Sequence, residues 1–161
     1  MSTTATNQDA ISVLNDLIEI NKDGEQGFRT AADSVTNADL KTMLHLYAQQ
    51  RARFGSELNN EVLRRGGQPA HSGHVSATLH RGWINLKSVV TGKSESAIVD
   101  ECERGEDSAK SNYEDALKKV LPSDLLSLVE TQYQEIKAAH DSIRELKRAE
   151  HAEHPEHASK A

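Results

Sequence analysis

The eight residues Asp100-Glu101-Cys102-Glu103-Arg104-Gly105-Glu106-Asp107 are the most charged run in the chain, yet they interrupt the pattern of a buried helix. Apolar or small residues recur around the run at steps of three and four: Val99, Cys102, Ala109, Tyr113, Ala116 and Val120. This spacing is typical of a helix packed in a bundle. The pattern continues without a break only if Glu106 also faces the core, and the charged residues Asp100, Glu101, Arg104 and Asp107 then form the solvated side of the helix. A buried carboxylate needs a partner, because an unpaired buried charge is costly.

Working outward from this run, four stretches carry the same helical stripe. They cover residues 9–35, 40–65, 94–120 and 125–147. Turn and capping signals separate them at Thr36-Asn37-Ala38-Asp39, at Gly66-Gly67 with Pro69, and at Leu121-Pro122-Ser123-Asp124. The sequence therefore predicts an all-α fold, a bundle of four long helices.

The connection between the second and third helices, residues 66–94, is long enough to run the length of a bundle. Within it, Val75 to Val90 has a helical pattern of its own, and we expect a short extra helix there that places Trp83 against the bundle. A crossover of this kind puts the two tight turns at opposite ends. Counting residues from the turns then brings Glu25 level with Glu106, whereas a link that put both turns at the same end would misplace these two residues by about one helical turn. The turn at 121–122 by itself sets Glu103 opposite His140.

Composition limits the classes of protein that fit. The 161 residues suit one domain at 9–147, with a flexible leader at 1–8 and a disordered His- and Glu-rich tail at 148–161. The net charge of -6 and the absence of a basic stripe argue against nucleic-acid binding. No segment has the length of a membrane span and no signal peptide is evident. The single Cys102 favours a reducing compartment, so we expect a cytoplasmic protein.

Polar residues interrupt each of the four stripes near its middle. They are Asn21 and Glu25, then Arg51, then Glu106, and finally Gln132 with His140 at the border. One interruption has little meaning, but four at similar levels predict a buried polar layer across the bundle. Either a metal or the Arg51 guanidinium would neutralise its carboxylates.

Several motifs resemble a bacterial family that is described as a domain of unknown function and placed with the ferritin-like four-helix bundles. They are Leu14-Asn15-Asp16-Leu17-Ile18, Asp23-Gly24-Glu25-Gln26-Gly27-Phe28, Gln50-Arg51-Ala52-Arg53-Phe54, His80-Arg81-Gly82-Trp83, Cys102-Glu103-Arg104-Gly105-Glu106-Asp107 and His140-Asp141. The resemblance implies a ferritin-like four-helix bundle with a long crossover that carries a short extra helix. It implies no activity.

Ferritin-like bundles bind two metals with one Glu from each of two helices and Glu-x-x-His from each of the others. Glu25 matches the first single Glu, and Glu106 or Glu103 matches the second. The remaining positions depart from the pattern. The second helix reads Gln50-Arg51-Ala52-Arg53, and the fourth reads Lys137-Ala138-Ala139-His140, which keeps only the His.

Two hypotheses follow. In the first, the protein is a non-enzymatic structural or interaction module in which a buried ion-pair layer replaces the metals, and no cofactor is needed. In the second, it binds Fe, Mn or Zn through Glu25, Glu103, Glu106 and His140, in connection with metal or oxidative stress. Exposed seams on such bundles often pair, which makes a homodimer an expectation. The sequence identifies no protein partner.

Overall fold

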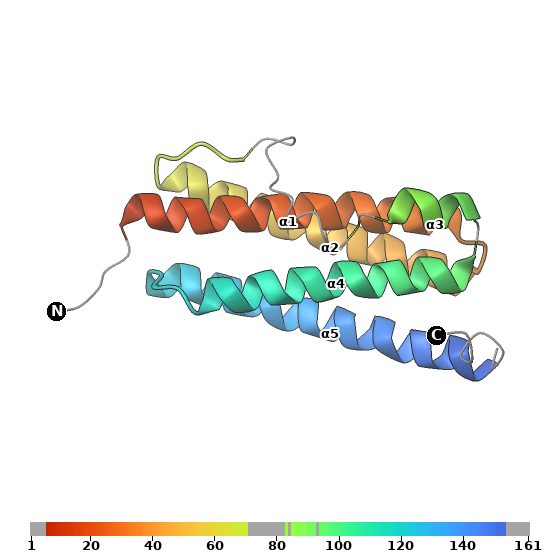
Figure 1. Ribbon diagram of the computed structural model, residues 1–161. Helices are drawn as coiled ribbons and strands as arrows, with labels where there is room; N and C mark the ends of the chain where they lie inside the picture. The colour runs from red at the N-terminus through yellow and green to blue at the C-terminus, as the bar shows by residue number, and fades with distance from the viewer. Residues whose placement is uncertain (1–5, 71–82, 84, 93, 154–161) are drawn as a thin grey trace.

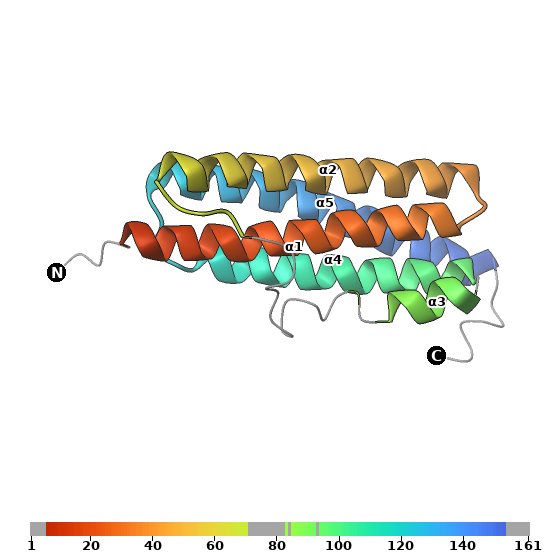
Figure 2. The same ribbon diagram turned by 90° about the horizontal axis from the view of Figure 1, so that it is seen from above.

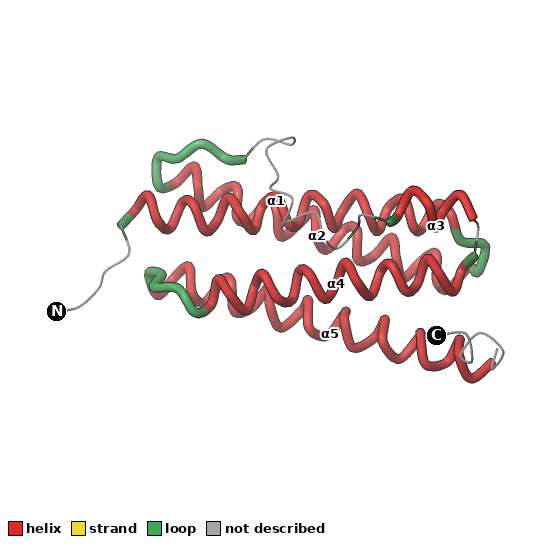
Figure 3. The backbone as a smooth tube through the Cα atoms, viewed as in Figure 1, coloured by secondary structure: helices red, strands yellow, loops and turns green. Residues whose placement is uncertain are grey.

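The computed structural model describes residues 6–70, 83, 85–92 and 94–153, and the regular structure within these ranges is α-helical (Figures 1 and 3). The helices are α1 (Asn7–Ser34), α2 (Ala38–Arg64), α3 (Leu86–Gly92), α4 (Glu95–Leu117) and α5 (Ser123–Glu153). The predicted all-α bundle with a short extra helix in its long connection is confirmed. Residues 75–82 of the predicted extra helix lie outside the described residues. Helix α5 continues past the predicted end at Lys147.

Short polar side chains fix the starts of three long helices. Thr6 accepts a hydrogen bond from the Asp9 N–H at 3.0 Å, and the Asp9 carboxylate accepts one from the Thr6 N–H in return. Asn37 and Ser94 cap α2 and α4 in the same way, each accepting from the N–H three residues on. Helix α2 ends before Gly66, whose φ of 79° suits a residue without a Cβ.

The two helical hairpins, α1–α2 and α4–α5, have their turns at opposite ends of the bundle (Figures 1 and 2). At one end, Glu95 at the start of α4 accepts hydrogen bonds from the backbone N–H groups of Thr36 and Asn37 in the α1–α2 turn. At the other end, Arg65 after α2 pairs with Asp124 at the start of α5, at 2.9 Å. These contacts confirm the predicted crossover.

The apolar core forms two clusters, one toward each end of the bundle. Toward the middle, one cluster stops at Ile20, Phe54, Ala109 and Ile136, and the other begins at Phe28, Ala48, Cys102 and Ile143. Buried polar side chains lie in this gap: Asn21, Arg51, Glu106 and His140. None of the described helices has an apolar stretch long enough to cross a membrane.

The chain before α3 contacts the bundle through Trp83. Its indole lies against the backbone of two glycines, because a Cβ added at Gly27 of α1 or Gly105 of α4 would come within 2.4 Å of the ring. The ring also meets Phe28 edge-on, with the centroids 5.0 Å apart. Trp83 thus bridges α1 and α4 beside the gap between the two core clusters.

Candidate functional site

The centre of the polar layer is an ion pair between Arg51 of α2 and Glu106 of α4, whose side chains are 1% and 0% exposed. Arg51 Nη2 lies 2.5 Å from Glu106 Oε1 and 2.6 Å from Oε2, and donates its hydrogen bond to Oε2. One nitrogen therefore serves both oxygens, and Oε1 lacks a well-aligned donor. Arginine pairs most strongly when two nitrogens meet the two oxygens in parallel, which is not the arrangement here.

Helix α1 makes room for the Arg51 side chain. A Cβ added at Gly24 would lie 3.3 Å from both Cγ and Nη1 of Arg51, closer than most such contacts. Phe28, one turn further on, holds its ring 5.4 Å from the guanidinium carbon, within cation–π range. The pair of glycines that flanks Glu25 in the sequence thus has two uses. Gly24 admits Arg51, and Gly27 admits Trp83.

Burial governs the protonation of Glu106. Full removal from water raises the pKa of this carboxyl, because desolvation penalises the charged form. The Arg51 guanidinium and, more weakly, His140 lower the pKa, but burial is the larger effect. Arg51 is therefore what keeps a carboxylate tolerable at this position.

A second polar set runs as a chain of hydrogen bonds through all four long helices. Asn21 Nδ2 donates to the Tyr113 hydroxyl at 2.8 Å, and Tyr113 donates to Gln132 Oε1 at 2.7 Å. Gln132 Nε2 donates to Glu57 Oε1 at 2.9 Å. The sequence patterns placed Asn21 and Gln132 in a polar layer but missed the roles of Tyr113 and Glu57. The available signal was Tyr113 itself, since a buried tyrosine hydroxyl needs a partner.

Two of the predicted metal ligands lie at the border of the bundle. The Glu25 side chain is 28% exposed and pairs with Arg29 one turn away at 3.1 Å, whereas Arg51 pairs with Glu106. The Glu103 side chain is 17% exposed and lies 3.7 Å from Lys147 Nζ. Each of these carboxylates therefore pairs with a partly exposed cation at the border of the bundle.

His140 meets a different carboxylate from the one predicted. Its Nε2 lies 2.5 Å from Asp107 Oδ1, and its Nδ1 lies 3.4 Å from Asp141 Oδ1. The sequence predicts Glu103 opposite His140 and Asp107 on the solvated face. Asp107 is 58% exposed, but its side chain reaches back to the imidazole. Side-chain direction, which residue counting does not include, decides between them.

Glu101 corrects the expectation that it belongs to the solvated side of α4. The residue is 2% exposed. Its Oε2 accepts a hydrogen bond from the backbone N–H of Asn85 at 2.7 Å, and Oε1 lies 3.4 Å from Arg104. The chain that leads into α3 therefore covers this part of α4. Cys102 beside it is buried, and burial raises the pKa of its thiol, as befits a small core residue.

The predicted ligands Glu25, Glu103, Glu106 and His140 each have a different ionic partner. Within the described residues, no three or more His, Cys, Asp or Glu side chains are grouped so that they could hold a metal ion. What the layer brings together is a guanidinium with a carboxylate, an imidazole with two carboxylates, and an amide–phenol chain. These groups can fix the positions of helices relative to one another.

The fold and the site define an all-α helical-bundle protein with a buried polar centre. Residues 9–119 match the family described as Domain of unknown function (DUF2383), which reaches from α1 to just beyond α4, and the chain belongs to this family. No curated protein matches the sequence.

Proposed function

We propose that the protein is a non-enzymatic structural or interaction module. In this proposal the Arg51–Glu106 pair stands where ferritin-like bundles hold their metals. The observation that carries the proposal is the fully buried guanidinium in contact with both oxygens of Glu106. A carboxylate that already faces a cation at 2.5 Å has its charge compensated without a metal.

The polar layer suits a scaffold because it penalises every other alignment of the helices. Sliding one helix by a turn would separate Arg51 from Glu106 and leave two buried charges without partners, which is strongly unfavourable. The hydrogen-bond chain from Asn21 to Glu57 acts in the same direction, since each buried polar group needs its partner. The layer thus favours one register of the helices, and it need not raise the free energy of unfolding.

Metal content decides between this proposal and a carboxylate–His metal protein. The full chain would be purified without a His tag and measured by elemental analysis and absorption spectroscopy. We expect far less than one equivalent of Fe, Mn or Zn. A stoichiometric metal, on the order of one or two per chain as in di-metal bundles, would overturn the proposal if it were lost in Glu106→Ala or Glu25→Ala. Asp100→Ala, at an exposed acid on the same helix as Glu106, is the control variant.

The interaction part of the proposal concerns the end of the bundle where α2 ends and α5 begins. Leu63, Val120 and Leu126 are large apolar side chains that are 39% exposed or more at this end. Pairing of two chains through such a seam would form a homodimer, which stays a prediction. Sedimentation analysis of the wild type and of Leu63→Glu tests it, and two monomeric samples would contradict it. The single cysteine supports a cytoplasmic location.

A further inference from the structure

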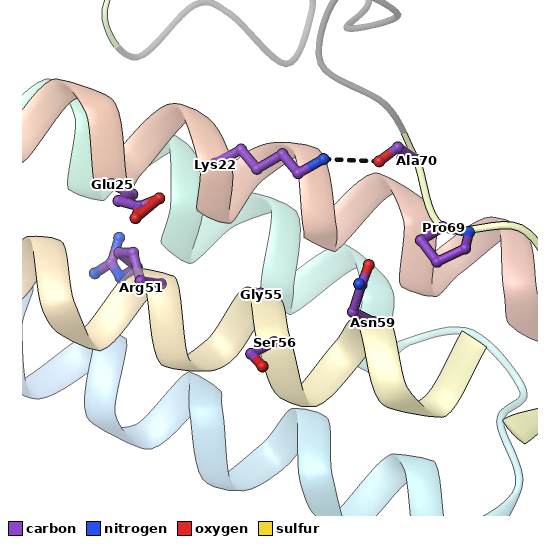
Figure 4. Close-up of a pocket in the computed structure, with 9 residues that line it drawn as sticks. Lys22, Glu25, Arg51, Gly55, Ser56, Asn59, Pro69 and Ala70 are labelled. Carbon is purple, nitrogen blue, oxygen red and sulfur yellow. Dashed lines mark hydrogen bonds between the residues drawn. The ribbon is translucent and has the colours of Figure 1, made fainter. Parts of the chain in front are cut away.

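A pocket of about 480 Å³ opens between α1 and α2, near the chain that follows α2. Its walls include Lys22, Glu25 and Arg51, and Pro69 and Ala70 line it where that chain passes (Figure 4). Small-molecule sites typically have volumes of about 300–1,000 Å³. The size of this pocket therefore fits a small ligand.

The charges in the pocket are separated by sign. In Figure 4, Glu25 and Arg51 lie at one end, Lys22 Nζ and Asn59 lie toward the other, and Gly55 lies between them. Arg51 adds little net charge at its end, because Glu106 neutralises it from inside the bundle. The pocket therefore presents a carboxylate at one end, paired with Arg29 through one of its oxygens, and an ammonium group at the other end.

Lys22 and Glu25 do not form an ion pair with each other. Residues three apart on a helix are neighbours that pair readily when their charges are opposite. Here Lys22 Nζ donates to the Ala70 carbonyl at 2.7 Å, and Glu25 Oε1 accepts from the exposed Arg29. Lys22 has two further N–H groups and Glu25 a second oxygen, so both can bind a ligand while they keep these contacts.

Gly55 forms the open middle of the pocket. A glycine inside a helix costs up to about 1 kcal/mol relative to alanine. Core packing does not require one here, because an added Cβ would meet only Asn21 Cβ, at an ordinary 3.9 Å. A glycine at this place keeps the space between the two charged ends empty.

We propose that this pocket binds a small zwitterion, a free amino acid or a short peptide. The ligand's ammonium group binds Glu25, its carboxylate binds Lys22 and Asn59, and its body lies over Gly55. The inference goes beyond the proposed scaffold role, because none of these three polar residues belongs to the Arg51–Glu106 pair.

Binding is tested by NMR on the full-length, 15N-labelled protein. The probes are the twenty free amino acids and glycylglycine, each titrated separately. We expect at least one probe to give saturable shifts of the amide signals of Gly55, Ser56 and Asn59. Comparing the affinity for glycylglycine with the affinities for single amino acids shows whether the ligand is a short peptide or a free amino acid. If no probe gives saturable shifts there, the proposal is wrong.

Charge-cancelled probes test the chemistry. For the tightest probe we expect its N-acetyl derivative and its C-terminal amide each to bind at least about tenfold more weakly, since each loses one charge-assisted contact. If the N-acetyl derivative bound as tightly as the parent probe, the pocket would recognise only the carboxylate, and the proposal would be wrong.

Variants test the location. Gly55→Met fills the pocket and should abolish the shifts, whereas Gly55→Ala, the matched control, should keep affinity within about threefold. Lys22→Met and Glu25→Gln should each weaken binding by about tenfold or more. All four variants are first checked for a cooperative unfolding transition that is at least as stable as that of the wild type. Unchanged binding by a folded Gly55→Met protein would show that the probe binds elsewhere.

Discussion

Arg51 compensates the charge of Glu106, whose carboxylate has no exposure to water, so the loss of Arg51 should destabilise the whole fold. We predict that Arg51→Leu destabilises the protein by about 3–5 kcal/mol, because Glu106 stays buried without a counter-charge. Urea unfolding measures this difference. Arg53→Leu is the control on the same helix, since Arg53 is 51% exposed and its pairs with Glu57 and Glu135 lie at the surface. Surface pairs contribute about 0–1 kcal/mol.

The defect in Arg51→Leu should also depend on pH in a defined direction. Without the guanidinium, the pKa of Glu106 rises further, so the folded state holds its proton more tightly than the unfolded chain does. Stability then falls as pH rises above the ordinary value of 4.5. The penalty should accordingly shrink toward pH 4. Adding Glu106→Leu should restore most of the stability, and a neutral Arg51→Leu would contradict the structure.

Tyr113 gives a second prediction at the residue scale. Tyr113→Phe removes the hydroxyl that joins Asn21 to Gln132 and leaves Gln132 Oε1 without its donor. We expect a loss of about 1–3 kcal/mol in the free energy of unfolding. Tyr133→Phe serves as control, because the Tyr133 hydroxyl bonds to the half-exposed Glu114. Equal losses in both variants would argue against the buried network.

Residue-level pairing was the least predictable part of the site. The burial of Arg51, Glu106, Asn21 and Gln132 follows from their place on the apolar stripes. Whether Glu25 turns inward depends on a small rotation of α1, and the rotation observed gives the interior position to Gly24. Periodicity along one helix cannot resolve such a rotation.

At the scale of elements, Trp83 and two glycines join the long connection to the bundle. Gly105→Ala would place a Cβ 2.3 Å from the indole, so the ring must move. We predict a loss of about 1–3 kcal/mol and a red shift in the emission of Trp83, the only tryptophan. Gly55→Ala, with its free space, should instead gain up to about 1 kcal/mol. An unshifted and fully stable Gly105→Ala would contradict this packing.

The element that covers a helix is harder to predict from sequence than the helix itself. From its charges, the run 100–107 is predicted to face solvent, with the exception of Glu106. The segment before α3 nevertheless lies over Glu101, and its Asn85 N–H satisfies the carboxylate. Helix periodicity predicted the long helices well, because their stripes are continuous. The cover depends on the path of a connection, for which the sequence has no comparable periodic signal.

At the scale of the whole molecule, the crossover was predictable because two independent features favoured it. The connection is long, and opposite turns bring Glu25 and Glu106 to one level, whereas turns at the same end misplace them by about one helical turn. The structure adds the contacts that join the hairpins at their ends, Glu95 with the α1–α2 turn and Arg65 with Asp124. These contacts exist in no arrangement that puts both turns at the same end.

Glu95 therefore offers a test of the topology through pH. Its Oε1 accepts hydrogen bonds from the N–H and hydroxyl of Thr36 and from the N–H of Asn37. These bonds lower the pKa of Glu95 below its ordinary 4.5, so the folded protein holds this proton more weakly than the unfolded chain. The resulting stabilisation is complete above the unfolded pKa and is lost as pH falls through the lowered one.

We predict that Glu95→Gln costs on the order of 1 kcal/mol at pH 7, because glutamine keeps the geometry but loses the charge. Urea unfolding between pH 7 and pH 3 should show the gap from wild type narrowing as pH falls below about 4.5, the region in which carboxyl groups take up protons. Glu145→Gln, at a side chain 78% exposed on α5, should show no such gap. A Glu95→Gln gap that stays constant down to pH 3 would mean that this carboxylate does not join the start of α4 to the α1–α2 turn.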